Sequence, residues 1–164
     1  TFNKRFAKRR KSFENGLRKL MKMEKEDLRS ELDISILKQN IELLKDCASD
    51  YNKVDDLSMK AYIADACVKR FEYTVETSWK LMKKYLKLVY GKTDKELTMN
   101  TIFRLMEGYG FIKSWEDWRN YYERRNDTSH EYDANKAKRL LLQADKLTAD
   151  CEFLYQQLKQ ALRQ

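Results

Sequence analysis

The sequence predicts an all-α protein: an up-and-down, antiparallel four-helix bundle with an extra basic N-terminal helix and a short helix in one connection. The 164 residues include no proline and only four glycines, whereas β-sandwiches and barrels need turn residues about every 8–12 positions. Hydrophobic residues make up 42% of the chain, which is enough for a core. They recur at intervals of three and four, as on one face of a helix.

The first two segments have the pattern of amphipathic helices. Residues 3–28 carry basic residues on one side and apolar residues on the other. Residues 33–52 have a stripe with heptad-like spacing. Ser30 and Asp33 are candidate start signals for this second helix. The apolar side of the first segment holds Phe6, Phe13, Leu17, Leu20 and Met21.

The longest predicted helix covers residues 56–90, and Gly91 is expected to end it as a C-cap. About 35 residues at 1.5 Å each give roughly 50 Å of helix. Burying a stripe of that length requires a long partner. The segment is therefore a candidate dimer surface, although the same stripe could be covered within one chain.

A short helix is predicted over residues 98–107, closed by Gly108. Ser114 and Asp117 have capping spacing and start the next helix, which runs to about Arg125.

The polar run at 126–129 competes locally for backbone hydrogen bonds and predicts a break. Asp133 can cap the last helix, over 134–162. No apolar run approaches the roughly 18–20 residues of a membrane span, so no membrane partner is expected.

The net charge of +8 is concentrated at the N-terminus. Residues 1–25 hold ten basic and two acidic residues, and the other 139 residues carry 24 of each. Such a cluster attracts a polyanion or an acidic partner, or it is simply a solvated helix face. The candidate RNA- or partner-binding residues in this segment are Lys4, Arg5, Lys8, Arg9, Arg10 and Lys11, and Arg124 is a further candidate later in the chain.

Three widely spaced cysteines, Cys47, Cys67 and Cys151, fit neither a disulfide framework nor a zinc site. We expect three reduced core thiols and a cytoplasmic location. The sequence has no nucleotide-binding glycine motif and no metal-ligand constellation. Neither a cofactor nor a metal is therefore expected.

His130 is the only histidine, and it lies in the predicted break beside Arg124 and Arg125. Histidine has an unperturbed pKa near neutrality and can move a proton. An arginine fork can hold a phosphate and the charge that develops on it. Together they suffice for phosphodiester cleavage, whereas a helix-cap histidine is the plain structural alternative.

Two separated motifs carry a resemblance to a known family. Arg125-x4-His130-x-Tyr132 is similar to the R-x4-H-x-Y pattern of HEPN-domain toxins. Residues 69–80, KRFEYTVETSWK, resemble the RFE(F/Y)T-x-E-x-x-W-K helix of one branch. That branch is the nucleotidyltransferase substrate-binding-protein-like family, which includes the HepT toxins. The likeness covers roughly residues 34–162.

The resemblance implies one HEPN-like domain over residues 1–164. Its bundle is 34–162, and 1–28 is an added basic helix, unless 34–52 is the insertion instead. The added helix could extend an RNA-binding surface or dock an antitoxin. Family members dimerise so that two R-x4-H motifs face one cleft, and active members are metal-independent ribonucleases acting on transfer or messenger RNA. Their partner is a minimal nucleotidyltransferase antitoxin, which in some pairs adenylylates the motif tyrosine, here Tyr132.

The expected roles follow from that resemblance. His130 is the general base or acid, Arg125 holds the phosphate, and Asn126 orients it. Tyr132 lines the cleft unless it is a buried structural tyrosine. Glu72 contacts Arg125 or His130, or forms only a structural salt bridge. The 2′-hydroxyl of RNA is the nucleophile, which leaves a 2′,3′-cyclic phosphate.

Two other functional classes stay open. One is a non-catalytic substrate-binding or regulatory subunit of a nucleotidyltransferase. The other is a basic nucleic-acid binder without chemistry, whose binding would depend steeply on salt and not on His130. The three tryptophans, Trp79, Trp115 and Trp118, are expected in the core or an interface.

Overall fold

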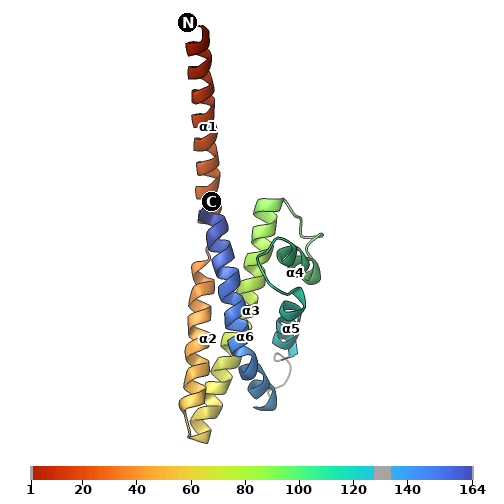
Figure 1. The fold of residues 1–164 in the computed structure, drawn as a ribbon. Coiled ribbons are helices and arrows are strands. Elements are labelled where there is room, and N and C mark those ends of the chain that lie inside the picture. The colour runs from red at the N-terminus through yellow and green to blue at the C-terminus, as the bar shows by residue number, and fades with distance from the viewer. Residues whose placement is uncertain (1, 128–133, 164) are drawn as a thin grey trace.

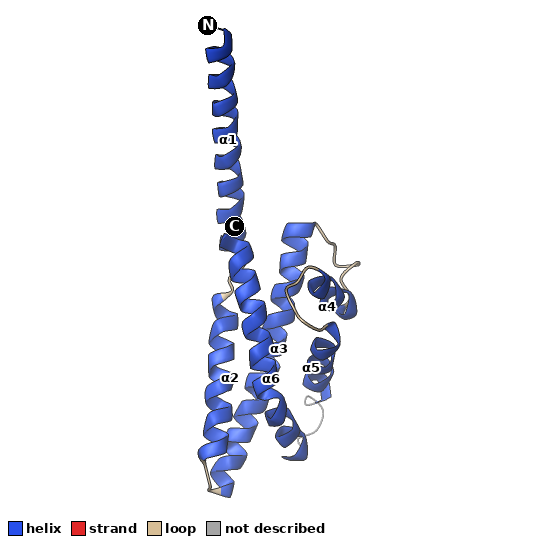
Figure 2. Ribbon diagram, in the orientation of Figure 1, coloured by secondary structure: helices blue, strands red, loops and turns tan. Residues whose placement is uncertain are grey.

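A computed structural model describes residues 2–127 and 134–163. Within these ranges every regular element is a helix and no strand occurs (Figure 2). The all-α class is therefore confirmed for this part of the chain. The helices are α1 (Phe2–Glu31), α2 (Ser35–Lys53), α3 (Leu57–Tyr90), α4 (Met99–Gly108), α5 (Trp115–Asp127) and α6 (Ala134–Arg163).

Helices α2 to α6 form the helical body, and α1 projects from one end of it (Figure 1). The chain runs down α2, up α3, down α5 and up α6, with the short α4 in the connection between α3 and α5. α2, α3 and α6 pack against one another, and α4 and α5 pack against α3. α1 contacts the body mainly where α6 ends.

Local capping explains where several helices begin. Asp56 caps α3 by accepting a hydrogen bond from the Met59 amide at 2.7 Å. Ser114 Oγ accepts from the Asp117 amide at 3.2 Å, which confirms the capping spacing before α5.

Gly91 ends α3 in the left-handed conformation, with φ of 63°, which confirms the predicted C-cap. Gly108 was expected to close α4, but it is the last helical residue. Gly110, two residues later, has the positive φ of 81°. The chain therefore reverses at Gly110, because a residue without Cβ adopts that backbone at little cost.

One predicted start signal is wrong. Ser30 lies inside α1, which continues to Glu31, and its hydroxyl donates to the Asp27 carbonyl at 2.7 Å. Asp33 does act at the start of α2, since its carboxylate accepts from the Ser35 amide at 2.9 Å. The helix of residues 3–28 is thus three residues longer than predicted at its C-terminal end.

The core runs along the contact of α2, α3 and α6 and extends to α4 and α5. Its largest fully buried side chains include Trp118, Phe71 and Phe103. Trp79 and Trp115 are half-buried and pack against the same core, as predicted. Cys67 and Cys151 are buried and Cys47 is half-buried, and all three are free thiols. Burial raises the pKa of the Cys151 thiol to about 12, so this thiol stays protonated and inert.

Candidate functional site

The site is built on the last turn of α5, where it lies against α3. Trp118 and Tyr121, earlier in α5, are almost fully buried and fix the helix on the body. The Tyr121 ring meets Phe71 of α3 edge-on, with ring centroids 6.4 Å apart. Its hydroxyl donates to Asp150 of α6 at 2.6 Å. Burial and this hydrogen bond raise the pKa of Tyr121, so it serves as a structural anchor.

Arg125 follows one turn after Tyr121 and points toward α3. Its Nη2 donates to Glu76 Oε2 at 2.6 Å, and its Nη1 donates to Asn126 Oδ1 at 3.0 Å. The Arg125 and Glu76 side chains are 31% and 30% exposed. The guanidinium is therefore oriented by two acceptors on its two terminal nitrogens and still lies at the surface.

Glu76 is shared between two cations. Its other oxygen, Oε1, pairs with Lys80 Nζ at 2.6 Å. The hydrogen bonds from Lys80 and from Arg125 hold the pKa of Glu76 below its usual value, so the carboxylate is charged at neutral pH.

A second ion pair lies one turn earlier on α3. Lys69 Nζ meets Glu72 Oε2 at 2.9 Å, and the Glu72 side chain is nearly buried. The hydrogen bond with Glu72 raises the pKa of Lys69, while the positive charge of Arg125 opposes that rise. The two pairs and Arg125 thus form one charged cluster across α3 and α5.

An aromatic pair borders this cluster. The ring of Trp79 on α3 meets Tyr122 on α5 edge-on, with centroids 6.4 Å apart. The indole Nε1 of Trp79 is buried and has no hydrogen-bond partner among the residues that the structure describes. The pair holds α5 against α3 directly beside Glu76.

A cluster of this composition can bind an anion and cannot by itself transfer a proton near neutrality. Arginine and lysine attract phosphate. No group of three or more potential metal ligands occurs among the described residues. The proton-transfer residue expected here is His130, which lies outside the described residues, as does Tyr132.

Comparison with known proteins assigns the family. The model of the family described as "Nucleotidyltransferase substrate binding protein like" matches residues 5–160. The chain belongs to this family. The predicted resemblance is therefore confirmed, and the match begins before residue 34 and includes most of α1. Whether 1–28 is an addition to the bundle stays a prediction.

Similar individual proteins support the same family assignment. "Probable ribonuclease HepT" of Haemophilus influenzae is 34% identical over 95 residues, which are 57% of this chain and 65% of the relative. The match thus spans less than two thirds of that relative. A solved H. influenzae structure, described as the fold of a substrate binding domain of a nucleotidyltransferase, has a TM-score of 0.70 at 25% identity. It covers 80% of this chain and all of its own.

A Thermus thermophilus structure shares the fold, with a TM-score of 0.61 at 22% identity. It covers 78% of this chain and 99% of its own.

The structure adds one residue that sequence reasoning missed. Glu72 was expected to contact Arg125 or His130, or to form a structural salt bridge. It pairs with Lys69, and Glu76 accepts a hydrogen bond from Arg125. Glu76 lies four residues later on the same face of α3, inside the matched KRFEYTVETSWK motif. The four-residue spacing from Glu72, which places both carboxylates on one face of the helix, was the sequence signal that could have identified Glu76. A contact of Glu72 with Arg125 or His130 stays a prediction.

The structure does not bring the basic N-terminal residues to this cluster. The six that were singled out, Lys4 to Lys11, lie on α1, whereas Arg125 lies near the far end of α5 (Figure 1). Arg124 lies beside Arg125 and is half-buried.

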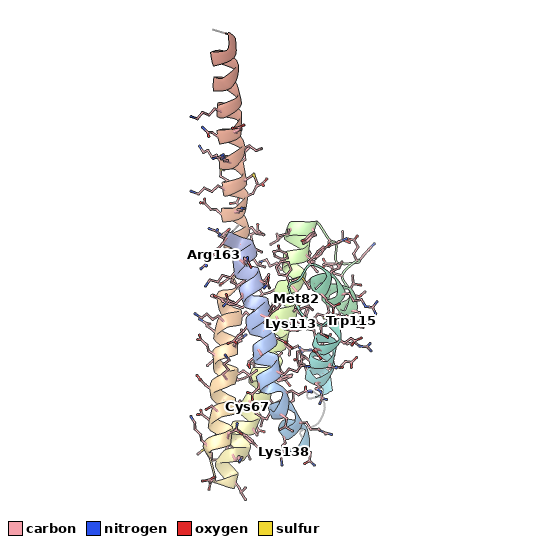
Figure 3. All side chains as sticks on the ribbon, viewed as in Figure 1. Cys67, Met82, Lys113, Trp115, Lys138 and Arg163 are labelled. Carbon is pink, nitrogen blue, oxygen red and sulfur yellow. The ribbon has the colours of Figure 1, made fainter. Side chains whose placement is uncertain are left out.

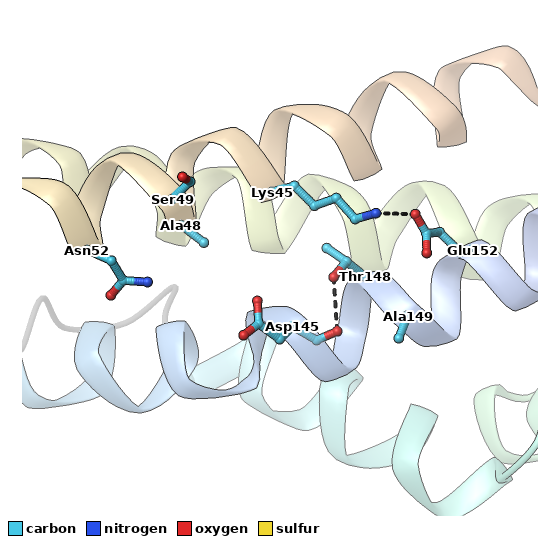
Figure 4. Close-up of a pocket in the computed structure, with 8 residues that line it drawn as sticks. All are labelled: Lys45, Ala48, Ser49, Asn52, Asp145, Thr148, Ala149 and Glu152. Atoms are coloured by element: carbon cyan, nitrogen blue, oxygen red, sulfur yellow. Dashed lines mark hydrogen bonds and ion pairs between the residues drawn. The ribbon is translucent and has the colours of Figure 1, made fainter.

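A different depression, of about 520 Å³, lies between α2 and α6 (Figure 4). Lys45 and Glu152 form an ion pair across it, and Thr148 donates to the Asp145 carbonyl at 3.0 Å. None of the residues predicted for the site lines it. Among the described helices, none is long and apolar enough to cross a membrane.

Proposed function

We propose that this chain is the toxin of a HEPN and minimal-nucleotidyltransferase pair, and that it is a metal-independent endoribonuclease. The observation that carries the proposal is Arg125, held at the surface by Glu76 and Asn126 five residues before the only histidine. A guanidinium fixed in this way is suited to a phosphodiester. The name of the H. influenzae relative supports the same activity.

The proposed reaction needs one base and one acid. One His130 takes the proton from the 2′-hydroxyl of RNA, and the 2′-oxygen attacks phosphorus. The bond to the 5′-oxygen breaks, and a second His130 gives that oxygen a proton. The products are a 2′,3′-cyclic phosphate and a 5′-hydroxyl. Arg125 stabilises the negative charge that develops on the phosphoryl oxygens.

A second histidine requires a second copy of the chain. In this proposal α2, α3, α5 and α6 are the four bundle helices, and the copies meet at the exposed face of α3. Met59, Tyr62 and Tyr73 on that helix are each more than half exposed. They lie on the same helix as the Lys69–Glu72 pair beside Arg125. A homodimer with two-fold symmetry would place both Arg125–His130 motifs in one cleft.

The cognate antitoxin is the remaining partner. We propose a minimal nucleotidyltransferase that transfers adenylate from ATP to the hydroxyl of Tyr132, with pyrophosphate leaving. A bulky anionic group two residues from His130 would repel the RNA backbone and block the cleft.

The test is cleavage of total cellular RNA in EDTA by the parent chain, His130→Ala and Arg125→Ala. We expect cleavage by the parent and loss of it in both variants. Arg119→Ala is the matched control, because Arg119 lies on the same helix and, within the described ranges, its ion pair is with Glu123 along that helix at 2.8 Å. It should cleave like the parent. Intact mass establishes first that Tyr132 is unmodified.

A non-catalytic role is the alternative, favoured by the family description and by the substrate-binding wording of the solved H. influenzae structure. If unmodified parent and His130→Ala are equally inactive on all RNA, the chain is a substrate-binding or regulatory subunit of the nucleotidyltransferase. Equal cleavage by both would instead remove His130 from the mechanism.

A further inference from the structure

α1 carries an apolar face that the helical body leaves uncovered. The helix is continuous from Phe2 to Glu31, and only its last turns reach the body. Leu17, Leu20 and Met21 are each about half exposed or more. Figure 3 shows the end of α6, at Arg163, beside the base of α1 and the rest of α1 projecting beyond it. A straight helix cannot fold its own N-terminal half back onto the body.

Read from the sequence, a stripe of α1 through positions 6, 10, 13, 17, 21, 24 and 28 is symmetric about Leu17. At 100° per residue, these seven positions lie within about 40° of Leu17, and Leu20 lies at the edge of the stripe, about 60° away. The residues before and after Leu17 correspond in type: Phe13 to Met21, and Phe6 to Leu28, which is half-buried and also packs against the core. Between them, Arg10 corresponds to Glu24, with opposite charge.

Such a pattern matches a second copy of the same helix running in the opposite direction. Antiparallel pairing about Leu17 places Phe13 against Met21, Phe6 against Leu28, and Arg10 against Glu24. Parallel pairing would instead put Arg10 against Arg10 and Glu24 against Glu24, which is unfavourable.

The charges of the two ends of α1 agree with the antiparallel direction. Residues 1–12 hold six basic and no acidic residues, and residues 24–31 hold four acidic and two basic ones. The basic N-terminal end of each helix would therefore meet the mainly acidic C-terminal end of its partner. Arg9 would also lie close to Asp27.

The base of α1 offers a groove for the arriving end. A depression of about 530 Å³ lies between α1 and the end of α3. Its apolar lining is Met21, Leu28, Leu88 and Val89. The carboxylates of Glu24, Asp27 and Glu31 line it as well, with the single cation Lys25. An apolar floor with a mainly acidic rim fits a basic segment that carries phenylalanines.

We propose that two copies of this chain associate through their α1 helices, paired antiparallel about Leu17. The basic N-terminal end of each α1 occupies the groove at the base of the other. This contact is separate from the charged cluster at Arg125, which lies on α5, away from the projecting part of α1 (Figure 1). It therefore does not depend on the proposed ribonuclease activity.

Disulfide formation between single introduced cysteines tests the contact and its direction. The full chain is used in a Cys47→Ser background, since the other two native thiols are buried. We expect Leu17→Cys to cross-link with itself. Arg10→Cys and Glu24→Cys should each stay uncross-linked alone and should cross-link with each other when mixed. The background chain, without an added cysteine, is the control.

Charge reversal gives a second measurement. In the Leu17→Cys chain, Arg10→Glu or Glu24→Arg alone should lose the cross-link, and the double exchange should restore it. Lys22→Glu is the matched control, because Lys22 is exposed and lies on the opposite side of α1. Absence of the Leu17→Cys cross-link, or self-linking of Arg10→Cys or Glu24→Cys, would overturn the proposal.

Discussion

Glu76 acts on Arg125 as a positioning residue in the proposed mechanism. Its two oxygens meet Lys80 and Arg125, so the carboxylate is held from one side and fixes the guanidinium from the other. An arginine already oriented loses less freedom when it binds a phosphate. The negative charge of Glu76 by itself would repel RNA. In the proposed mechanism Glu76 therefore contributes by orienting the Arg125 guanidinium.

Replacing Glu76 by alanine should lower ribonuclease kcat by about ten- to a hundredfold, because a displaced guanidinium no longer meets the transition state. KM should change little, since loss of the carboxylate leaves in place the cations that attract the RNA phosphates. Glu76→Gln, which keeps an acceptor oxygen, should recover part of the loss. The measurement is steady-state cleavage of a short RNA. Glu123→Ala, on the outer face of α5, is the control, and an equal loss there would contradict the assignment.

The pH dependence of stability should report the same carboxylate. The pKa of Glu76 is lowered in the folded chain from its usual 4.5 by Lys80 and Arg125. Its contribution to stability is therefore complete above pH 4.5 and lost as the pH falls through the lowered value. Glu76→Gln should destabilise the chain at pH 7 by less than about 1 kcal/mol.

Urea unfolding of the parent and Glu76→Gln at pH 7 and pH 3 measures this effect. The difference in the free energy of unfolding should shrink at pH 3, because below pH 4.5 the unfolded parent binds a proton at Glu76 more readily than the folded chain does. A difference of the same size at both pH values would show that the ion pairs do not stabilise the fold.

At the scale of elements, the ends of α3 and α4 respond oppositely to the same substitution. An added Cβ meets nothing within 4 Å at Gly91 or at Gly108, so sterics with neighbours do not decide the outcome. Gly91 has a φ of 63°, whereas Gly108 is helical. We expect Gly91→Ala to destabilise by about 1 kcal/mol. Gly108→Ala should be neutral or stabilising by up to about 1 kcal/mol. Thermal or urea unfolding checks both signs, and destabilisation by both would contradict the backbone explanation.

The helices were largely predictable because each carries a three-and-four apolar repeat. The expected 56–90 and 98–107 segments differ from α3 and α4 by no more than one residue at each end. The prediction that Ser30 starts a helix was wrong because serine is common at helix starts but is also tolerated near helix ends. There its hydroxyl donates to a carbonyl of the preceding turn, as Ser30 does.

The candidate site was predictable in its motif and not in its contacts. Arg125 donates to Asn126 Oδ1 at 3.0 Å, and the roles expected of these two residues toward a phosphate stay predictions. The contact of Glu76 with Arg125 depends on how α5 is shifted along α3, and the buried Trp118 and Tyr121 fix α5 in that position. A periodic pattern within one helix carries no information about the register between two helices. Tertiary geometry was therefore needed to find Glu76.

For the whole molecule, the two proposed contacts between copies use different surfaces, one on α1 and the other on the exposed face of α3. Each contact has its own two-fold axis if both form. Two different isologous contacts on one subunit generate closed rings or open chains of copies. The proposed antitoxin, if it binds beside the cleft, would then be present several times in one assembly.

The projecting part of α1 should be helical only when it is paired. A single helix in water gains little from its own hydrogen bonds and depends on packing of its apolar face. Leu17→Asp places a charge at the centre of that face. We therefore expect it to lower the far-UV helical signal and the amide protection of residues 5–23, while the protection of α2 and α3 stays unchanged.

Hydrogen exchange at two protein concentrations makes the measurement. In the parent, protection of residues 5–23 should rise with concentration, because pairing is bimolecular. The core amides around Phe71 and Leu86 should be indifferent to concentration. If α1 is protected equally in the parent and in Leu17→Asp at both concentrations, the helix is stable by itself and its apolar face does not depend on a second copy.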